Sequence, residues 1–429
     1  MPEPQARAGA RYAVTVLTAM NLLNYIDRYV PSANKDLIKA ELHLTDTQTS
    51  LPLTAFVWVY MIASPLFGGL ADRWSRPKLI AAGVALWSLA TAGAALAQDF
   101  WGFLGARALV GIGEAAYATL APPLLAEFFP PERRNRVLTF FYLAIPVGAA
   151  LGFAIGGVTG AHYGWRAAFL VCGLPGILAA LFALRIRDPR EALTSGHAPG
   201  VAGGPSTSPG AMSPEVAPAA WPEALRLLRG NAIYVCAVGG YTAVTFAQGA
   251  MADWFPSYLV RYPHLDEGQA GSIVGGITVV AGIGGTALGG WLADKAASWT
   301  RQPYLGLSAV SMAVAACLAA ALFCAPADQP MLIYVLMFGA SFFLWFYNGP
   351  INALIANATA APLRARAFAL SILCIHLLGD ALSPTIVGLV SDGVGDLRTA
   401  MFLVPVAMAV GALVWARGWR RLPELAVAT

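Results

Sequence analysis

Charged side chains stand inside two segments that are otherwise apolar and long enough to cross a membrane. The segment 12–33 carries Asp27 and Arg28, and the segment 100–127 carries Arg107 and Glu114. A charge in hydrocarbon costs several kcal/mol, so such residues usually face a watery or protein-lined interior and act there. The sequence therefore predicts a polar path inside a shell of lipid-facing helices.

The depth of these charges suggests which of them meet. Asp27 and Arg107 each lie about seven residues from the outer end of their segments, or roughly 10 Å below the surface. We expect them to pair if the two segments are neighbours, with Glu114 alone two turns deeper. A carboxylate ionises readily beside arginine and poorly in a dry site, so Asp27 and Glu114 can switch protonation with conformation. The alternatives are a static ion pair and, for Arg107, a grip on an anionic substrate.

Polar residues also interrupt later apolar segments. His376 and Asp380 are four residues apart and share a helix face, as do Asn348 and Asn352. Histidine titrates near neutral pH and can shuttle protons. Such residues can line a cavity or simply hydrogen-bond neighbouring helices. The candidate cavity residues are Arg28, Tyr25, Tyr117, Gln248, Trp254, Asn348, Asn352, His376 and Asp380.

The composition is that of a chain dissolved in lipid. Hydrophobic residues make up 58% and charged residues 12% of the 429 residues, and the mean hydropathy is +0.62. Soluble proteins carry about 25% charged residues. The basic residues have no interleaved aromatic platform, so we expect no nucleic-acid partner. The five cysteines lie in apolar runs without a CxxC pair, which indicates small hydrophobes rather than disulfides or metal ligands. We expect no metal and no cofactor, with protons as the coupling ion.

An all-α membrane protein with twelve transmembrane helices is predicted, since about 20 apolar residues span the hydrocarbon. The predicted spans are 12–33, 49–71, 78–97, 100–127, 137–160, 165–185, 231–260, 268–293, 303–325, 331–356, 366–391 and 397–418.

The basic residues set the orientation of these spans. With the N-terminus inside, 20 of the 27 Lys and Arg residues are cytoplasmic, 5 lie on the opposite side, and Arg28 and Arg107 lie within the membrane. Because positive residues accumulate on the cytoplasmic side, we expect both termini there.

The chain divides into two similar halves. A stretch at 186–230, with a core at 196–218 rich in Gly, Ala, Pro and Ser, predicts a flexible cytoplasmic linker between six-helix bundles at 1–185 and 231–429. Gly-Gly-Leu-Ala-Asp-Arg at 68–73 closes the second span, and Gly-Trp-Leu-Ala-Asp-Lys at 290–295 closes the eighth. Arginine-rich turns at 132–136 and 363–366 precede the fifth and eleventh spans. Parallel repeats with a site at their interface describe major facilitator transporters.

The loop at 68–78 resembles the motif that joins the second and third spans in that superfamily. An Asp at a helix N-terminus can be locked by arginines, so the loop predicts a cytoplasmic latch that breaks when the halves rock. The alternative is that the basic residues of this loop only hold it on the cytoplasmic side of the membrane, as the positive-inside rule describes. The candidate gate residues are Asp72, Arg73, Arg76, Lys78, Asp294, Arg136 and Arg366.

Three tracts resemble the spinster branch of the major facilitator superfamily. They are Asn-Tyr-Ile-Asp-Arg at 24–28, Gly-Ile-Gly-Glu-Ala at 111–115, and His-Leu-Leu-Gly-Asp-Ala-Leu-Ser-Pro at 376–384. Animal spinster proteins export lysosphingolipid phosphates or lysophospholipids. The resemblance implies a proton-driven transporter of a lysolipid or sphingolipid-like amphiphile, acting by alternating access in a bacterial inner membrane, as a monomer among membrane lipids. It also implies proton coupling by Asp27, Arg107 and Glu114.

Other functions stay open at this point. The first is a major facilitator carrier of small organic anions or drugs. An integral-membrane enzyme acting on lipid is disfavoured, because the chain has no H-E-x-x-H or G-x-S-x-G motif and no acidic metal cluster. A sensor that binds a ligand without transporting it is the third.

Overall fold

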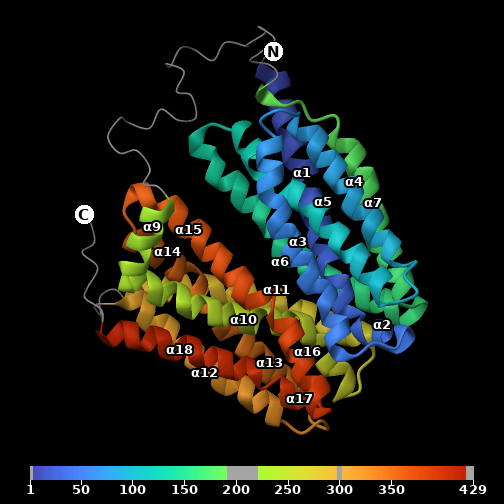
Figure 1. The fold of residues 1–429 in the computed structure, drawn as a ribbon, viewed down its shortest axis with the longest axis vertical. Helices are drawn as coiled ribbons and strands as arrows, with labels where there is room; N and C mark the ends of the chain where they lie inside the picture. Colours follow the sequence, from blue (N-terminus) through green and yellow to red (C-terminus); the bar gives the residue numbers. More distant parts are fainter. Residues whose placement is uncertain (1–2, 191–220, 297–301, 422–429) are drawn as a thin grey trace. The chain divides into compact units, whose positions relative to one another are not determined.

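The computed structural model describes residues 3–190, 221–296 and 302–421, and within these ranges the chain forms helices and no β-strand (Figure 1). It divides into two compact units. The N-terminal unit comprises Met1–Pro205 with His264–Gly275, and the C-terminal unit comprises Ser206–Pro263 with Gly276–Thr429. The predicted flexible core at 196–218 lies outside the described residues.

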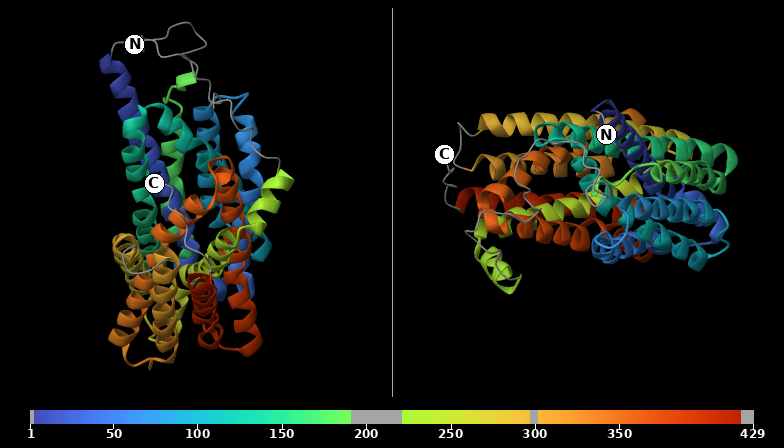
Figure 2. Two further views of the ribbon diagram at one scale, coloured as in Figure 1. Left: turned by 90° about the vertical axis from the view of Figure 1, so that its left-hand side faces the viewer. Right: turned by 90° about the horizontal axis from the view of Figure 1, so that it is seen from above.

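The N-terminal unit is a bundle of long helices that run alongside one another in each view (Figures 1 and 2). Helix α1 packs against α6, α5 lies between α3 and α4, and α7 covers α4. Its helices are α1 (Glu3–Ala33), α2 (Lys35–Leu42), α3 (Asp46–Leu70), α4 (Arg76–Ala94), α5 (Phe100–Glu127), α6 (Pro131–Tyr163) and α7 (Trp165–Ala183).

The C-terminal unit is a second bundle in which α18 packs against both α10 and α12. Two of its membrane-length helices are interrupted, one by a 3₁₀ turn and one by a π-helical turn. Its elements are α9 (Trp221–Gly230), α10 (Ala232–Arg261), α11 (Glu267–Ala296), α12 (Pro303–Cys324), α13 (Pro330–Leu344), η1 (Trp345–Tyr347), α14 (Asn348–Ala358), α15 (Ala361–Ile375), η2 (His376–Asp380), α16 (Ser383–Val394), α17 (Leu397–Ala400) and α18 (Leu403–Arg421). Helix α11 is divided between the units, because its residues up to Gly275 belong to the N-terminal unit.

Each of the twelve predicted spans corresponds to a helix or to an interrupted helix. Ten of them are long and apolar enough to cross a membrane. The other two are α1 and α10, which are 31 and 30 residues long. Two short helices were not predicted. Helix α2 follows the first span, and α9 occupies the last part of the expected linker, where Ala224 and Leu228 are buried.

Small residues let α5 approach its neighbours at backbone distance. A Cβ added to Gly111 would lie 2.6 Å from the carbonyl oxygen of Phe56 on α3, and one added to Gly113 would lie 2.5 Å from that of Gly83 on α4. Such contacts are the usual way in which helices pack closely within membranes. The helix itself begins at an N-cap, where the Asp99 side chain accepts a 2.8 Å hydrogen bond from the backbone N–H of Gly102. These features fix the position of the charges that α5 carries.

Candidate functional site

The charged residues of α1 and α5 lie together in the N-terminal unit, and we call Asp27, Arg28, Arg107 and Glu114 the charged site. Asp27 and Arg107 are each 1% exposed, and Glu114 is fully buried. Only Arg28 is partly open, with 24% of its side chain exposed. Four ionisable groups in one buried place are costly unless they compensate one another.

One ion pair crosses the charged site. Arg28 Nη2 donates to Glu114 Oε2 at 2.5 Å, which joins α1 to α5. The expectation that Glu114 stands alone was therefore wrong. Successive residues point about 100° apart around a helix, so Arg28 and Asp27 leave α1 in different directions. The long arginine side chain reaches the deeper carboxylate, which counting residues along each span could not show.

Asp27 and Arg107 do not form the expected pair. Both carboxylate oxygens of Asp27 and both terminal nitrogens of Arg107 lack a hydrogen-bond partner among the described residues, although each group lies within the field of the other. Buried polar groups are nearly always hydrogen-bonded, so each exception calls for an explanation. Asp27 and Arg107 carry opposite charges and interact without a hydrogen bond between them. A small movement of either side chain, or a bound ligand, can supply the missing hydrogen bonds.

Aromatic rings hold the two arginines. The Arg28 guanidinium carbon lies 4.8 Å from the ring centre of Tyr25, 5.0 Å from Phe56 and 5.9 Å from Tyr60. Phe56 also faces Arg107, at 5.5 Å. Ring faces attract cations, and more strongly when water is excluded. Phe56 and Tyr60 could not be recognised from the sequence, because aromatic residues in an apolar span carry no signal of their own.

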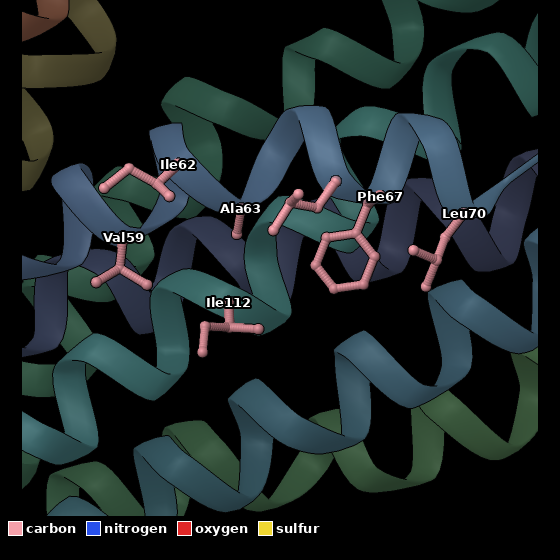
Figure 3. Close-up of a pocket in the computed structure, with 7 residues that line it drawn as sticks. Val59, Ile62, Ala63, Phe67, Leu70 and Ile112 are labelled. Carbon is pink, nitrogen blue, oxygen red and sulfur yellow. The ribbon is translucent and has the colours of Figure 1, made fainter.

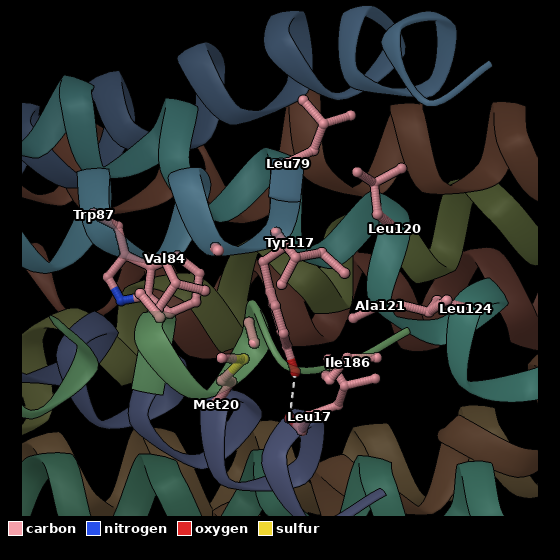
Figure 4. Packing of buried hydrophobic residues seen from close by; sticks show 14 of the residues in the cluster. Leu17, Met20, Leu79, Val84, Trp87, Tyr117, Leu120, Ala121, Leu124 and Ile186 are labelled. Carbon is pink, nitrogen blue, oxygen red and sulfur yellow. Dashed lines mark hydrogen bonds between the residues drawn. The ribbon is translucent and has the colours of Figure 1, made fainter. Parts of the chain in front are cut away.

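Tyr117 follows Glu114 by three residues on α5 and belongs to the packed hydrophobic core (Figure 4). Its side chain is 1% exposed, its hydroxyl donates to the carbonyl oxygen of Leu17 at 2.6 Å, and its ring meets Trp87 edge-on. These are packing contacts. The Trp87 indole Nε1 has no hydrogen-bond partner among the described residues and is positioned to donate to Asp27. Trp87 is a second residue that the sequence did not single out.

In the C-terminal unit, the predicted neighbours on helix faces are confirmed. His376 Nδ1 lies 2.9 Å from Asp380 Oδ2 within the π-helical turn η2. The Asn352 side chain donates to the carbonyl oxygen of Asn348 at 2.7 Å. Turns of the π type are rare and often occur at functional sites. Both pairs are local contacts within one helical segment.

The remaining cavity candidates of this unit differ in exposure. Gln248 is half-buried and accepts a 3.0 Å hydrogen bond from the hydroxyl of Tyr347, a residue the sequence analysis did not select. Trp254 is fully buried, and its indole donates to the carbonyl oxygen of Pro384 at 2.9 Å. Its contacts tie α10 to α16.

A second charged cluster forms at the start of α4. Arg76 is 1% exposed and holds Glu127 through two hydrogen bonds of 2.8 and 2.7 Å. It also donates to Asp188 from Nε at 2.9 Å and from Nη2 at 2.5 Å. Burial alone would raise the pKa of Asp188, but the hydrogen bonds from Arg76 and from the Arg190 backbone, with the charge of Arg76, lower it below its usual value. We call Arg76, Glu127, Asp188 and Arg190 the Arg76 cluster.

The other gate candidates do not join the Arg76 cluster. Asp72 is exposed and forms no hydrogen bond or ion pair with the described residues, so the expected Asp72–arginine lock is absent from this structure. Arg73, Lys78, Arg136 and Asp294 are exposed as well. Arg366 is half-buried, with its guanidinium 5.5 Å from the ring centre of Trp221. The acids that hold Arg76 were overlooked, although Glu127 ends one predicted span and Asp188 follows the end of another.

Metal chemistry has no evident place in the described residues, where no group of three or more His, Cys, Asp or Glu side chains could hold an ion.

Comparison with known proteins adds three findings. Residues 17–384 match the model of the Major Facilitator Superfamily. The chain is 32% identical to protein spinster homolog 1 of Mus musculus over 434 residues, covering 95% of this chain and 80% of that protein. It is 29% identical to the probable sphingolipid transporter spinster homolog 1 of Arabidopsis thaliana, covering 94% and 87%. Across curated spinster relatives, the chain spans 62% to 87% of their length.

A solved structure shares the fold. The crystal structure of a bacterial homolog to the human lysosomal transporter Spinster, in an inward-facing and occupied conformation, aligns with a TM-score of 0.79 at 20% identity. The alignment covers 96% of this chain and 97% of that one.

Proposed function

Because the chain belongs to the spinster branch of the major facilitator superfamily, we propose that it is a proton-coupled transporter of a lysolipid or sphingolipid-like amphiphile. Membership makes it an integral, multi-pass membrane protein and a transporter rather than an enzyme. Proton coupling, alternating access and the lipid substrate are the parts that we infer. One observation carries the inference: the Arg28–Glu114 ion pair beside Asp27 and Arg107, two buried charges without a hydrogen-bond partner among the described residues.

The ion pair supplies a simple coupling step. A proton on Glu114 removes the charge that holds Arg28, and the pair weakens from an ionic to a neutral hydrogen bond. Arg28 is then free to bind an anionic head group, with Arg107 as a second cation nearby. Asp27 is a second proton site, since accepting a proton removes the cost of its unpartnered charge. Transport and protonation are coupled because the charge of Arg28 is balanced in both states. The ionised Glu114 balances it in the empty site, and the anionic head group balances it in the protonated, loaded site.

The substrate class rests on chemistry and on the relatives. Two cations framed by aromatic rings suit a phosphate or other anionic head group. The name of the Arabidopsis relative supports a sphingolipid-like substrate. A small organic anion or drug could use the same cations, and the free terminal nitrogens of Arg107 favour this second candidate.

We also propose the cellular setting. Both termini are cytoplasmic, as 20 of the 27 Lys and Arg residues support. The membrane is a bacterial inner membrane, and the protein acts as a monomer. Two six-helix bundles, 1–185 and 231–429, alternate access around the substrate, with residues 186–230 as their cytoplasmic linker.

A proteoliposome screen tests the function. Lysophosphatidic acid, sphingosine phosphate, an aromatic acid and a cationic dye are each offered with and without an imposed pH gradient. We expect flux of the single-chain lipids, driven by the gradient and abolished when a protonophore collapses it. Flux of only the acid or dye would favour the second candidate. Lipid flux that ignores the gradient would contradict proton coupling.

A further inference from the structure

An apolar groove runs along α3 within the N-terminal unit (Figure 3). Six residues of α3 between Val59 and Leu70 line it, together with Ile112 of α5. Its volume is about 400 Å³. Ile62 and Leu66 are 65% and 63% exposed, so the groove is open along one side. Val59 and Leu70 are eleven positions apart, and at 1.5 Å per residue the groove extends about 16 Å.

The groove continues the aromatic wall of the charged site. Phe56 and Tyr60, whose rings face Arg28, are followed on the same face of α3 by Ala63 and Phe67. On α5, Ile112 follows Gly111, a position that packs against the backbone of Phe56 and Tyr60. The close approach of Gly111 to Phe56 closes the space between the helices at this end. The groove therefore begins where Arg28 stands and leads away from it.

The partial exposure of Arg28 shows which environment the groove faces at this end. A charge within a membrane span faces water or protein rather than hydrocarbon. Tyr60 and Val59 are neighbours on α3, and both are half-buried. The groove thus starts beside a polar space, whereas an ordinary lipid-facing surface would have no cation at its end. Among the residues that the structure describes, Arg28 Nε and both terminal nitrogens of Arg107 are buried donors without a hydrogen-bond partner near this end.

We propose that this groove binds the single hydrocarbon chain of an anionic amphiphile whose head group binds Arg28. The proposal deepens the proposed function and rests on it for the class of substrate. A cation at one end and an apolar channel leading from it match the two parts of such a molecule. Because α3 supplies nearly the whole lining, the chain lies parallel to this helix, with its end near Leu70.

Photolabelling locates the chain without relying on transport. The full-length protein in lipid nanodiscs is exposed to lysophosphatidic acid with a diazirine either at the end of the chain or next to the head group. We expect the chain-end probe to label peptides around Leu66–Leu70 and the head-side probe to label Phe56–Tyr60. With a shorter, octanoyl chain, the chain-end label should move toward Val59.

Two variants with similar exposure provide the control. Leu66→Gln places an amide in the groove and should weaken chain-end labelling about tenfold, as the loss of one apolar contact predicts. Leu89 on α4 is 58% exposed and lies outside the groove, so Leu89→Gln should leave labelling unchanged. Equal labelling of the Leu66 and Leu89 regions, or equal competition by a two-chain phospholipid, would mean bulk lipid only and overturn the proposal.

Flux measured on the same preparations separates this inference from the proposed function. Gradient-driven lipid flux with labelling outside the groove would overturn the groove and leave the function intact. Groove labelling without flux would support the binding site and count against transport.

Discussion

The two units bury polar groups of different kinds. In the N-terminal unit, the charged site holds four ionisable groups, and within the described part of the chain the oxygens of Asp27 and the terminal nitrogens of Arg107 have no hydrogen-bond partner. In the C-terminal unit, the site candidates form neutral hydrogen bonds, as between Gln248 and Tyr347, or a half-exposed contact between His376 and Asp380. Asp253 is a buried acid in the C-terminal unit, and it has an interaction partner. Among the described residues, the buried carboxylate oxygens without a hydrogen-bond partner all belong to the N-terminal unit, whereas the C-terminal unit has one such charged-group atom, Arg366 Nη1. Proton sensing is therefore expected in the N-terminal unit, and the C-terminal unit is expected to contribute shape.

Glu114→Gln is expected to have the largest effect and is the strictest test of this difference between the units. Glutamine keeps the shape but cannot ionise, so the ion pair with Arg28 and its dependence on pH are lost. We expect proton-driven flux to fall about a hundredfold, measured in proteoliposomes with an imposed gradient. The matched control is Asp380→Asn in the C-terminal unit. If that variant loses as much flux, or if Glu114→Gln keeps its response to pH, proton sensing does not belong to the N-terminal unit alone.

Arg107→Ala should have the next largest effect. It removes a buried cation that faces the Phe56 ring, and with it the arginine charge that acts on the Asp27 carboxylate. We expect about a thirtyfold loss of flux while the protein stays folded, judged by its elution from a sizing column and its melting temperature. Arg107→Lys keeps the charge and should recover part of the flux. Normal flux in the alanine variant would remove Arg107 from the mechanism.

The Arg76 cluster gives a prediction for stability as a function of pH. The pKa of Asp188 is lower in the folded state than in the unfolded chain, so its stabilising effect is complete above about pH 4 and is lost as the pH falls through the folded pKa. At pH 7, Asp188→Asn should lower stability by about 1 kcal/mol. The melting temperatures of the two proteins should converge as the pH falls below about 4 and through the lowered pKa of Asp188. A constant difference across that range would show that Asp188 does not act through its charge.

His376→Asn should have the smallest effect. The His376–Asp380 contact is local and about 40% and 30% exposed, so little free energy depends on it. We expect flux to change by less than about threefold and the pH midpoint of transport to stay in place. A shift of that midpoint would bring the C-terminal unit into proton coupling and end the contrast between the units.

The sequence was sufficient for the membrane-length helices and for the members of the charged site, because charges inside apolar spans stand out against their surroundings. The sequence could not show which side chains each charged residue contacts. Residue counting placed Asp27 opposite Arg107 by depth, but pairing depends on the direction of each side chain around its helix and on its length. Phe56, Trp87, Glu127 and Asp188 were missed for a related reason: each matters through a contact between helices. The break at η2 was also invisible, since its residues fit an α-helix by pattern.

The formal charges of the four residues of the charged site determine its net charge in each state. With two arginines and two carboxylates ionised, the site is neutral. One proton makes it singly positive, and one monovalent anion restores neutrality, so the two would travel together as a load without net charge. The membrane potential performs work of about 2.3 kcal/mol per charge per 100 mV, and on a neutral load it performs none. Transport should then respond to a pH difference and be indifferent to a voltage set with potassium and valinomycin.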